Sequence, residues 1–105
     1  MSQVMNLEQK IKWALEMTLD PVFLKVENIS HMHSVPHGAE THFQIYIVSD
    51  KFKSKKRIER QRLVHDALSN LLPDIHSTTQ RLQTNDEWVA VGKPQDFDVP
   101  ECFGG

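Results

Sequence analysis

The sequence predicts a two-layer α+β sandwich in which helices cover a small sheet. Three observations predict it. Apolar residues recur at three- and four-residue spacing near the N-terminus and again in the second half of the chain, which indicates two amphipathic helices. Segments of alternating apolar and polar residues lie between and after these helices. The order helix, strand, strand, helix, strand then gives each apolar helix stripe a sheet to pack against.

The first half of the chain accounts for one helix and two strands. Residues 4–18 predict a helix that cannot continue past Pro21. Alternation predicts strands at residues 22–27 and 43–48. Residues 28–41 contain a proline and a glycine, which favours an ordered loop over a tight hairpin turn. The apolar positions of the helix are Val4, Leu7, Ile11 and Leu15.

The second half predicts one more helix and one more strand. Residues 56–72 carry an apolar stripe that a proline terminates. Residues 75–83 predict a strand that is unusually polar, as expected at the edge of a sheet or at a docking surface. Thr84 followed by Glu87 has the form of a capping box, so a short last helix is expected there.

Size and composition exclude several classes of protein. At 105 residues the chain has the length of one compact domain. Hydrophobic residues make up 39% and charged residues 25%, which is unlike a disordered chain or a disulfide scaffold. Apolar runs are far shorter than the roughly 20 residues that cross a bilayer, so we expect no membrane attachment. The charged first twelve residues are unlike a secretory signal, and the single Cys102 suits a reducing compartment, so we expect a cytoplasmic protein.

Positive charge is concentrated in one segment although the net charge is −2. Residues 51–62 hold seven of the twelve lysines and arginines, against the single acid Glu59. Such a segment is either a solvated entrance to a helix or a surface that attracts phosphate or an acidic protein. The candidate nucleic-acid or partner-binding residues are Lys53, Lys55, Lys56, Arg57, Arg60, Gln61 and Arg62.

Histidines supply the remaining chemistry. Four lie within twelve residues of the loop and its end, and His76 lies far away in the sequence. Neutral imidazole is a ligand for zinc, iron and copper. The alternative is that these side chains are exposed or hydrogen-bonded in turns. The four are His31, His33, His37 and His42.

Several spaced motifs resemble the signature of the BolA family. That signature has a loop with His, Val-Pro, Gly, Glu-Thr-His-Phe and Val-Ser-Asp, then Val-His and a closing Glu-Trp. Here the motifs are found in residues 31–43, 47–50, 60–64, 75–76 and 87–88. The resemblance implies a class II KH-like α+β fold with a three-stranded mixed sheet. It also implies a BolA-like domain over residues 1–90 and a flexible C-terminal tail over residues 91–105.

The resemblance further implies a role for two histidines. In this family, residues at the positions of His33 and His76 help to hold a [2Fe–2S] cluster that is shared with a monothiol glutaredoxin and glutathione. We expect that cluster only in the complex and no cofactor in the isolated chain. His42 is interpreted as structural, His65 as a boundary residue, and Cys102 as an incidental tail cysteine. Whether His31 or His37 can replace His33 stays open.

Two departures limit the resemblance. Arg81 stands where many bacterial members have a second histidine, so no ligand is expected there. The chain also lacks the Gly-x-x-Gly loop with which KH domains grip single-stranded nucleic acid.

Three functions follow, none of them enzymatic, because the sequence contains no nucleophile elbow, dinucleotide loop or zinc-hydrolase motif. The first is a glutaredoxin partner in iron–sulfur trafficking or in iron and redox regulation. The second is a DNA-binding transcriptional regulator of stress response or morphology, which uses the basic entrance of the second helix. The third is a purely structural interaction module. The expected oligomeric state is a monomer or a weak homodimer.

Overall fold

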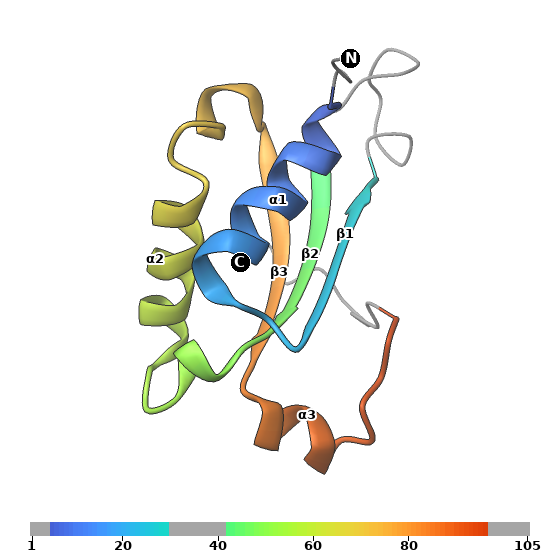
Figure 1. Ribbon diagram of the computed structural model, residues 1–105, viewed down its shortest axis with the longest axis vertical. Coiled ribbons are helices and arrows are strands. Elements are labelled where there is room, and N and C mark those ends of the chain that lie inside the picture. The colour runs from blue at the N-terminus through green and yellow to red at the C-terminus, as the bar shows by residue number, and fades with distance from the viewer. Residues whose placement is uncertain (1–4, 30–41, 97–105) are drawn as a thin grey trace.

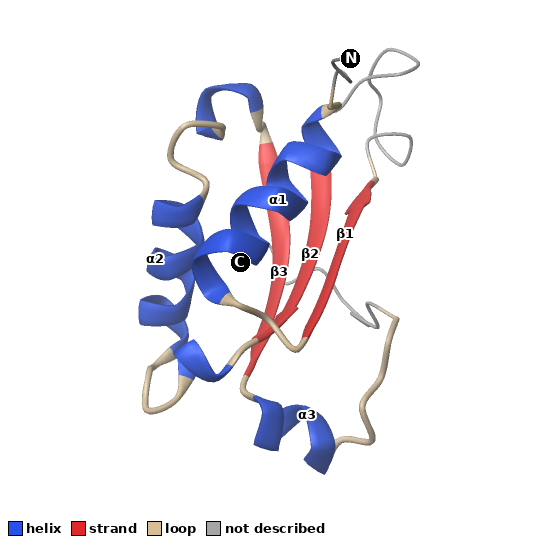
Figure 2. Cartoon of the chain, viewed as in Figure 1, coloured by secondary structure: helices blue, strands red, loops and turns tan. Residues whose placement is uncertain are grey.

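A computed structural model describes residues 5–29 and 42–96 of the chain. Figure 2 shows a layer of helices against one sheet, as predicted. Short 3-10 turns occupy Asp50–Phe52 and Leu72–Asp74. The helices and strands are, in chain order, α1 (Leu7–Leu19), β1 (Phe23–Asn28), β2 (His42–Val48), α2 (Arg57–Ala67), β3 (Ser77–Gln83) and α3 (Asn85–Ala90).

The three strands form one mixed sheet in the order β1-β2-β3. β1 and β2 are antiparallel, whereas β2 and β3 are parallel, with His42 opposite Ser77 and Val48 opposite Gln83. In Figure 1, α1 crosses the front of the sheet, α2 lies alongside β3, and α3 lies at the lower end. The predicted mixed sheet is therefore confirmed, and the polar strand is an edge strand, as expected. Because β2 and β3 are parallel, both begin at the same end of the sheet.

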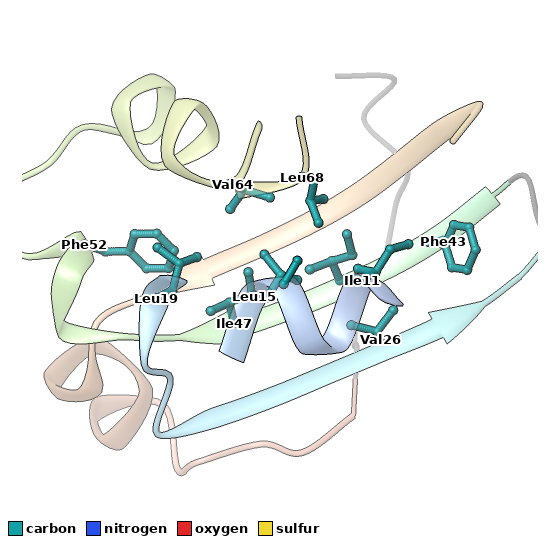
Figure 3. Packing of buried hydrophobic residues seen from close by; sticks show 11 residues of the cluster. Ile11, Leu15, Leu19, Val26, Phe43, Ile47, Phe52, Val64 and Leu68 are labelled. Atoms are coloured by element: carbon teal, nitrogen blue, oxygen red, sulfur yellow. The ribbon is translucent and has the colours of Figure 1, made fainter. Parts of the chain in front are cut away.

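The main core lies between the two long helices and the sheet. Ile11 and Leu15 of α1 are fully buried against Ile45 and Ile47 of β2, and Val64 of α2 joins them. Figure 3 shows Ile11, Leu15, Ile47 and Val64 converging from both layers. Burying one such side chain contributes roughly 1.5 to 3 kcal/mol. The predicted apolar stripes therefore pack against the sheet, except at Ile58, which was expected in the second stripe and is 55% exposed at the start of α2. Val4 of the first stripe lies outside the described residues.

A second cluster covers part of the opposite face of the sheet. Tyr46 and Val48 are fully buried there, although their neighbours on β2 point to the main core. Phe23 stacks on Trp88 at 5.1 Å between ring centroids and meets Tyr46 edge-on at 5.2 Å. The alternation in the sequence indicated half-buried strands. Instead, this end of the sheet is buried on both faces because α3 brings Trp88 under it.

Two helix boundaries differ from the prediction. α1 begins at Leu7, where Asn6 accepts a hydrogen bond from the Gln9 amide and forms a capping box. α2 ends at Ala67, before the predicted end at residue 72, and the chain continues through turns. Ser and Asn in residues 68–71 favour turns over helix interiors, and a residue before proline avoids helical geometry. The apolar pattern therefore continues beyond the end of the helix.

The other elements begin or end within two residues of their predicted positions. β3 begins at Ser77, two residues later than expected, and α3 begins after the predicted capping box of Thr84 and Glu87. In the part of the chain that the structure describes, no helix has the length and apolar character needed to cross a bilayer.

Candidate functional site

His76 lies at the end of the sheet where β2 and β3 begin. It immediately precedes β3, is exposed, and has its ring centroid 5.0 Å from that of His42, the first residue of β2. The pairing of His42 with Ser77 brings the two imidazoles together, because it fixes the parallel register of the strands. The sequence interpretation treated His42 as a structural residue, and the register shows that it is also a neighbour of His76.

The loop that carries the other histidines starts and returns at this same end. The Ile29 amide donates a hydrogen bond of 2.8 Å to the His42 carbonyl, which closes the base of residues 30–41. His31, His33 and His37 themselves lie outside the described residues, as does Cys102. The expected approach of His33 to His76 therefore stays a prediction, although both ends of its loop lie at the same end of the sheet as His76.

His65 lies elsewhere, exposed on α2. Its position agrees with the expectation that it does not join the histidine pair. Within residues 5–29 and 42–96, no three side chains of His, Cys, Asp or Glu gather into a metal-binding group. A metal centre at His76 therefore requires ligands from outside these residues.

The basic segment surrounds the start of α2. Lys53, Lys56, Arg57 and Arg62 are exposed, whereas Lys55 is partly buried. The Lys53 ammonium lies 3.7 Å from the Asp50 carboxylate, and the Lys53 side chain remains 58% exposed. Gln61 is also partly buried, on the side of α2 that faces β3. Most of the predicted cations are thus available to a partner.

Arg60 is the exception, because its guanidinium is engaged within the domain. It forms two hydrogen bonds of 2.7 and 3.0 Å with the Glu87 carboxylate and donates to the carbonyls of Lys55 and Leu82. Its side chain is only 14% exposed. Arg60 therefore ties α2 to β3 and α3.

The same contact changes the acidity of Glu87. Hydrogen bonds from Arg60, with a smaller contribution from the Thr84 amide, lower the pKa of Glu87 from its ordinary 4.5 to about 2. The pKa of Arg60 is raised by the hydrogen bonds that it donates to the Glu87 carboxylate. Both shifts favour the charged pair, so the link between α2 and α3 is ionic throughout the neutral range.

A groove of about 360 Å³ separates the start of α2 from the second half of β3. Among the described residues, no acidic side chain lines it. Beneath its surface, the side-chain oxygen of Gln80 is buried and has no hydrogen-bond partner among the described residues. The lining residues are Lys55, Arg57, Arg60, Gln61, Gln80, Arg81, Leu82 and Gln83.

Comparisons with known proteins identify the family. A profile described as BolA-like protein matches residues 15–87. BolA-like protein 1 of Bos taurus is 38% identical over 94% of this chain and 73% of its own length. The DNA-binding transcriptional regulator BolA of Vibrio cholerae is 35% identical over 94% of this chain and 93% of its own. The chain belongs to the BolA family.

Solved BolA structures share the fold. The solution structure of mouse BolA1 has a TM-score of 0.79 at 35% identity, over 99% of this chain and 84% of that one. The BolA domain of SufE1 from Arabidopsis thaliana has a TM-score of 0.73 at 37% identity, over 81% of this chain and 99% of that one. The KH-like BolA fold expected from the motifs is therefore confirmed.

The sequence did not reveal three features of this BolA domain. Trp88, which closes the family motif, anchors the segment after α3, because its indole N–H donates to the Pro94 carbonyl at 2.9 Å. Lys25 of β1 pairs with Asp96 at 3.2 Å, so residues 91–96 contact the domain. The groove beside β3 was also missed. Its only sequence signal was the polar character of that strand.

Proposed function

We propose that this BolA protein partners a monothiol glutaredoxin in the cytoplasm and shares a [2Fe–2S] cluster with it and with glutathione. The observation that supports this proposal is the position of His76. Its imidazole is exposed at the end of the sheet, beside His42 and beside the base of the loop that contains His33. His76 is thus fixed by a strand, whereas His33 belongs to the loop that starts and returns beside it.

The chemistry of the histidine side chains suits a [2Fe–2S] centre. Imidazole nitrogen is a known ligand of iron in [2Fe–2S] centres, and replacing thiolate by histidine raises the reduction potential. His76 and His33 are the ligands that we assign to this chain. Two ligands do not complete a cluster, so the glutaredoxin and glutathione thiolates supply the others. The bound cluster supplies the iron and sulfide that are delivered, or the redox state that is sensed.

The test is co-purification with the cell's monothiol glutaredoxin, followed by visible absorption and iron content of the complex. We expect His76→Ala to bleach the shared cluster, because the ligand at the start of β3 is lost. His33→Ala is expected to alter the spectrum while some cluster is retained, since His31 or His37 can take its place in the loop.

The matched control is His65→Ala, which removes an exposed histidine from α2. It is expected to leave spectrum and iron content unchanged. A complex of His76→Ala with the full spectrum of the unaltered pair would overturn the assignment. Complete and equal loss from His33→Ala and His76→Ala would show instead that the loop offers no substitute ligand.

We propose DNA binding as a second function, supported by the exposed cations at the start of α2. Relatives from Vibrio cholerae and Escherichia coli are named DNA-binding transcriptional regulators. Arg57, Gln61 and Arg62 have side chains that can read base edges, whereas Lys53 and Lys56 suit phosphate. Arg60 is not assigned to DNA, because it is already bound to Glu87.

Salt dependence tests this second function. If the segment neutralises phosphates, a plot of the logarithm of affinity against the logarithm of salt concentration has a slope of about −0.9 for each phosphate that is neutralised. The triple variant Lys53→Gln/Lys56→Gln/Arg62→Gln is expected to bind more weakly and with a flatter slope. The control Lys10→Gln/Lys12→Gln, on α1, is expected to retain the original slope. An unchanged slope in the triple variant, or no binding at low salt, would remove support for DNA binding.

A further inference from the structure

We infer that the edge of β3 beside α2 is a docking site for an extended acidic segment of a partner protein, which adds to the sheet as a fourth strand. The site begins at Thr78, two residues after His76, and extends along β3 away from the histidine pair. Because a strand rises about 3.3 Å per residue, Leu82 in the groove lies roughly 16 Å along the strand from Ser77. The inference therefore goes beyond the cluster proposal and does not depend on it.

The first observation is the unpaired edge of β3. This strand is the last in the sheet, and the carbonyl of Gln83 points inward to accept from the Ser49 amide. The N–H and C=O of one residue point to the same edge of a strand, and successive residues alternate between the two edges. Since Gln83 points towards β2, the backbone groups of Thr78, Gln80 and Leu82 point outward. Arg60 satisfies the Leu82 carbonyl. Within the described residues, the outward groups of Thr78 and Gln80 have no partner.

The second observation is the side chain of Gln80. Its amide nitrogen donates to the Thr78 hydroxyl at 2.8 Å, and its buried oxygen has no partner among the described residues. Exchanging the two amide atoms does not help, because the nitrogen then becomes the atom without a partner. Buried polar groups are usually satisfied, so an incoming group with both donors and acceptors is favoured at this position.

The third observation is the charge of the groove. Lys55 and Arg57 line it, and neither has an ion-pair partner in the described part of the chain. Side chains that alternate along an added strand would face this cationic wall at every second position. Glutamate or aspartate at those positions provides the complementary charge, which is why we assign an acidic segment.

A peptide fits this edge better than a nucleic acid does. A phosphate backbone offers only acceptors to the site, whereas the outward carbonyls of Thr78 and Gln80 require donors. A peptide backbone presents N–H and C=O groups at the spacing of the strand edge. Nucleic acid is therefore one outcome of the test and not the occupant that we assign.

The probe is a capped peptide of alternating glutamate and threonine, titrated against the whole chain while amide hydrogen exchange is followed residue by residue. We expect binding to slow exchange at Thr78 and Gln80. A peptide methylated at alternate backbone nitrogens is expected to bind at least about tenfold more weakly, because it loses the donors of a strand. A single-stranded oligonucleotide of equal charge is the comparison ligand.

Two matched pairs of variants locate the site. Gln80→Pro removes an outward N–H and no bond to β2, so it should abolish strand addition while the fold remains. Gln80→Ala keeps the outward N–H and loses only the side-chain contact, so it should weaken binding much less. Arg57→Glu reverses a charge that lines the groove and should weaken binding about tenfold, whereas Arg62→Glu, outside the groove, should change it less than about twofold.

Three results would overturn the inference. One is that the acidic peptide does not bind. Another is that backbone methylation and Gln80→Pro leave its affinity unchanged, which would mean that only charge is recognised. The third is that the oligonucleotide, and not the peptide, protects Thr78 and Gln80.

Discussion

Arg60 shows at the level of one residue how a sequence segment divides into different roles. Most of its neighbours in the basic segment are exposed, whereas its guanidinium bridges α2, β3 and α3. A bidentate arginine contact fixes geometry better than a lysine does, because the planar fork matches both carboxylate oxygens. The cation that looked like part of a binding surface is therefore a structural link.

The lowered pKa of Glu87 predicts a defined acid dependence. Since this pKa falls from 4.5 to about 2 on folding, the contribution of Glu87 to stability is complete above pH 4.5 and is lost as the pH falls towards 2. Glu87→Gln is expected to flatten the stability profile between these values. The carboxylate is 47% exposed, so solvent screens the pair and the difference should be about 1 kcal/mol at most.

Chemical denaturation at a series of pH values measures this effect. Arg60→Lys serves as the companion variant, because it keeps the charge and loses the two-pronged contact. We expect it to show an intermediate dependence. An acid profile of Glu87→Gln that matches the unaltered protein would contradict the assignment.

At the level of elements, the strands position the functional groups more firmly than the helices do. The parallel register of β2 and β3 places His42 beside Ser77 and so brings His76 next to His42. The outward groups of β3 follow from its place at the edge of the sheet. α2 contributes mainly the cationic wall of the groove. Its shorter length does not affect this wall, because the relevant residues lie at its beginning.

At the level of the whole molecule, the sheet is stabilised from both faces. The two long helices cover one face, and Trp88 with Phe23, Tyr46 and Val48 covers part of the other. The contacts of residues 94 and 96 with Trp88 and Lys25 extend this second layer beyond α3. The stability of the domain therefore depends on its last short helix.

The two tryptophans test this dependence. Trp88 is 9% exposed and Trp13 is 58% exposed on α1. Trp88→Ala should lower the free energy of unfolding by about 3 to 5 kcal/mol, since it leaves a cavity against Phe23 and Tyr46. Trp13→Ala should change it by about 0.5 kcal/mol or less. Urea denaturation followed by circular dichroism measures both, and equal effects would show that the second layer contributes little.

Much of this protein was determined by its sequence alone. Hydrophobic periodicity and turn residues specify the order of the elements, the two-layer arrangement and the capping box at Thr84, because these depend on contacts a few residues apart. The order of the motifs in the sequence is sufficient to show the resemblance to the BolA family. The boundary of α2 was wrong because an apolar stripe continues through turns that still face the core.

Only the tertiary structure decided which distant residues meet. The pairing of His42 with His76 follows from strand register, and the Arg60–Glu87 contact joins residues 27 positions apart in the sequence. The burial of Tyr46 beneath Trp88 and the groove beside β3 likewise depend on how α3 and α2 pack. Such contacts arise from the packing of whole elements. Local periodicity predicts which face of an element is buried, but it does not predict which side chains that face contacts.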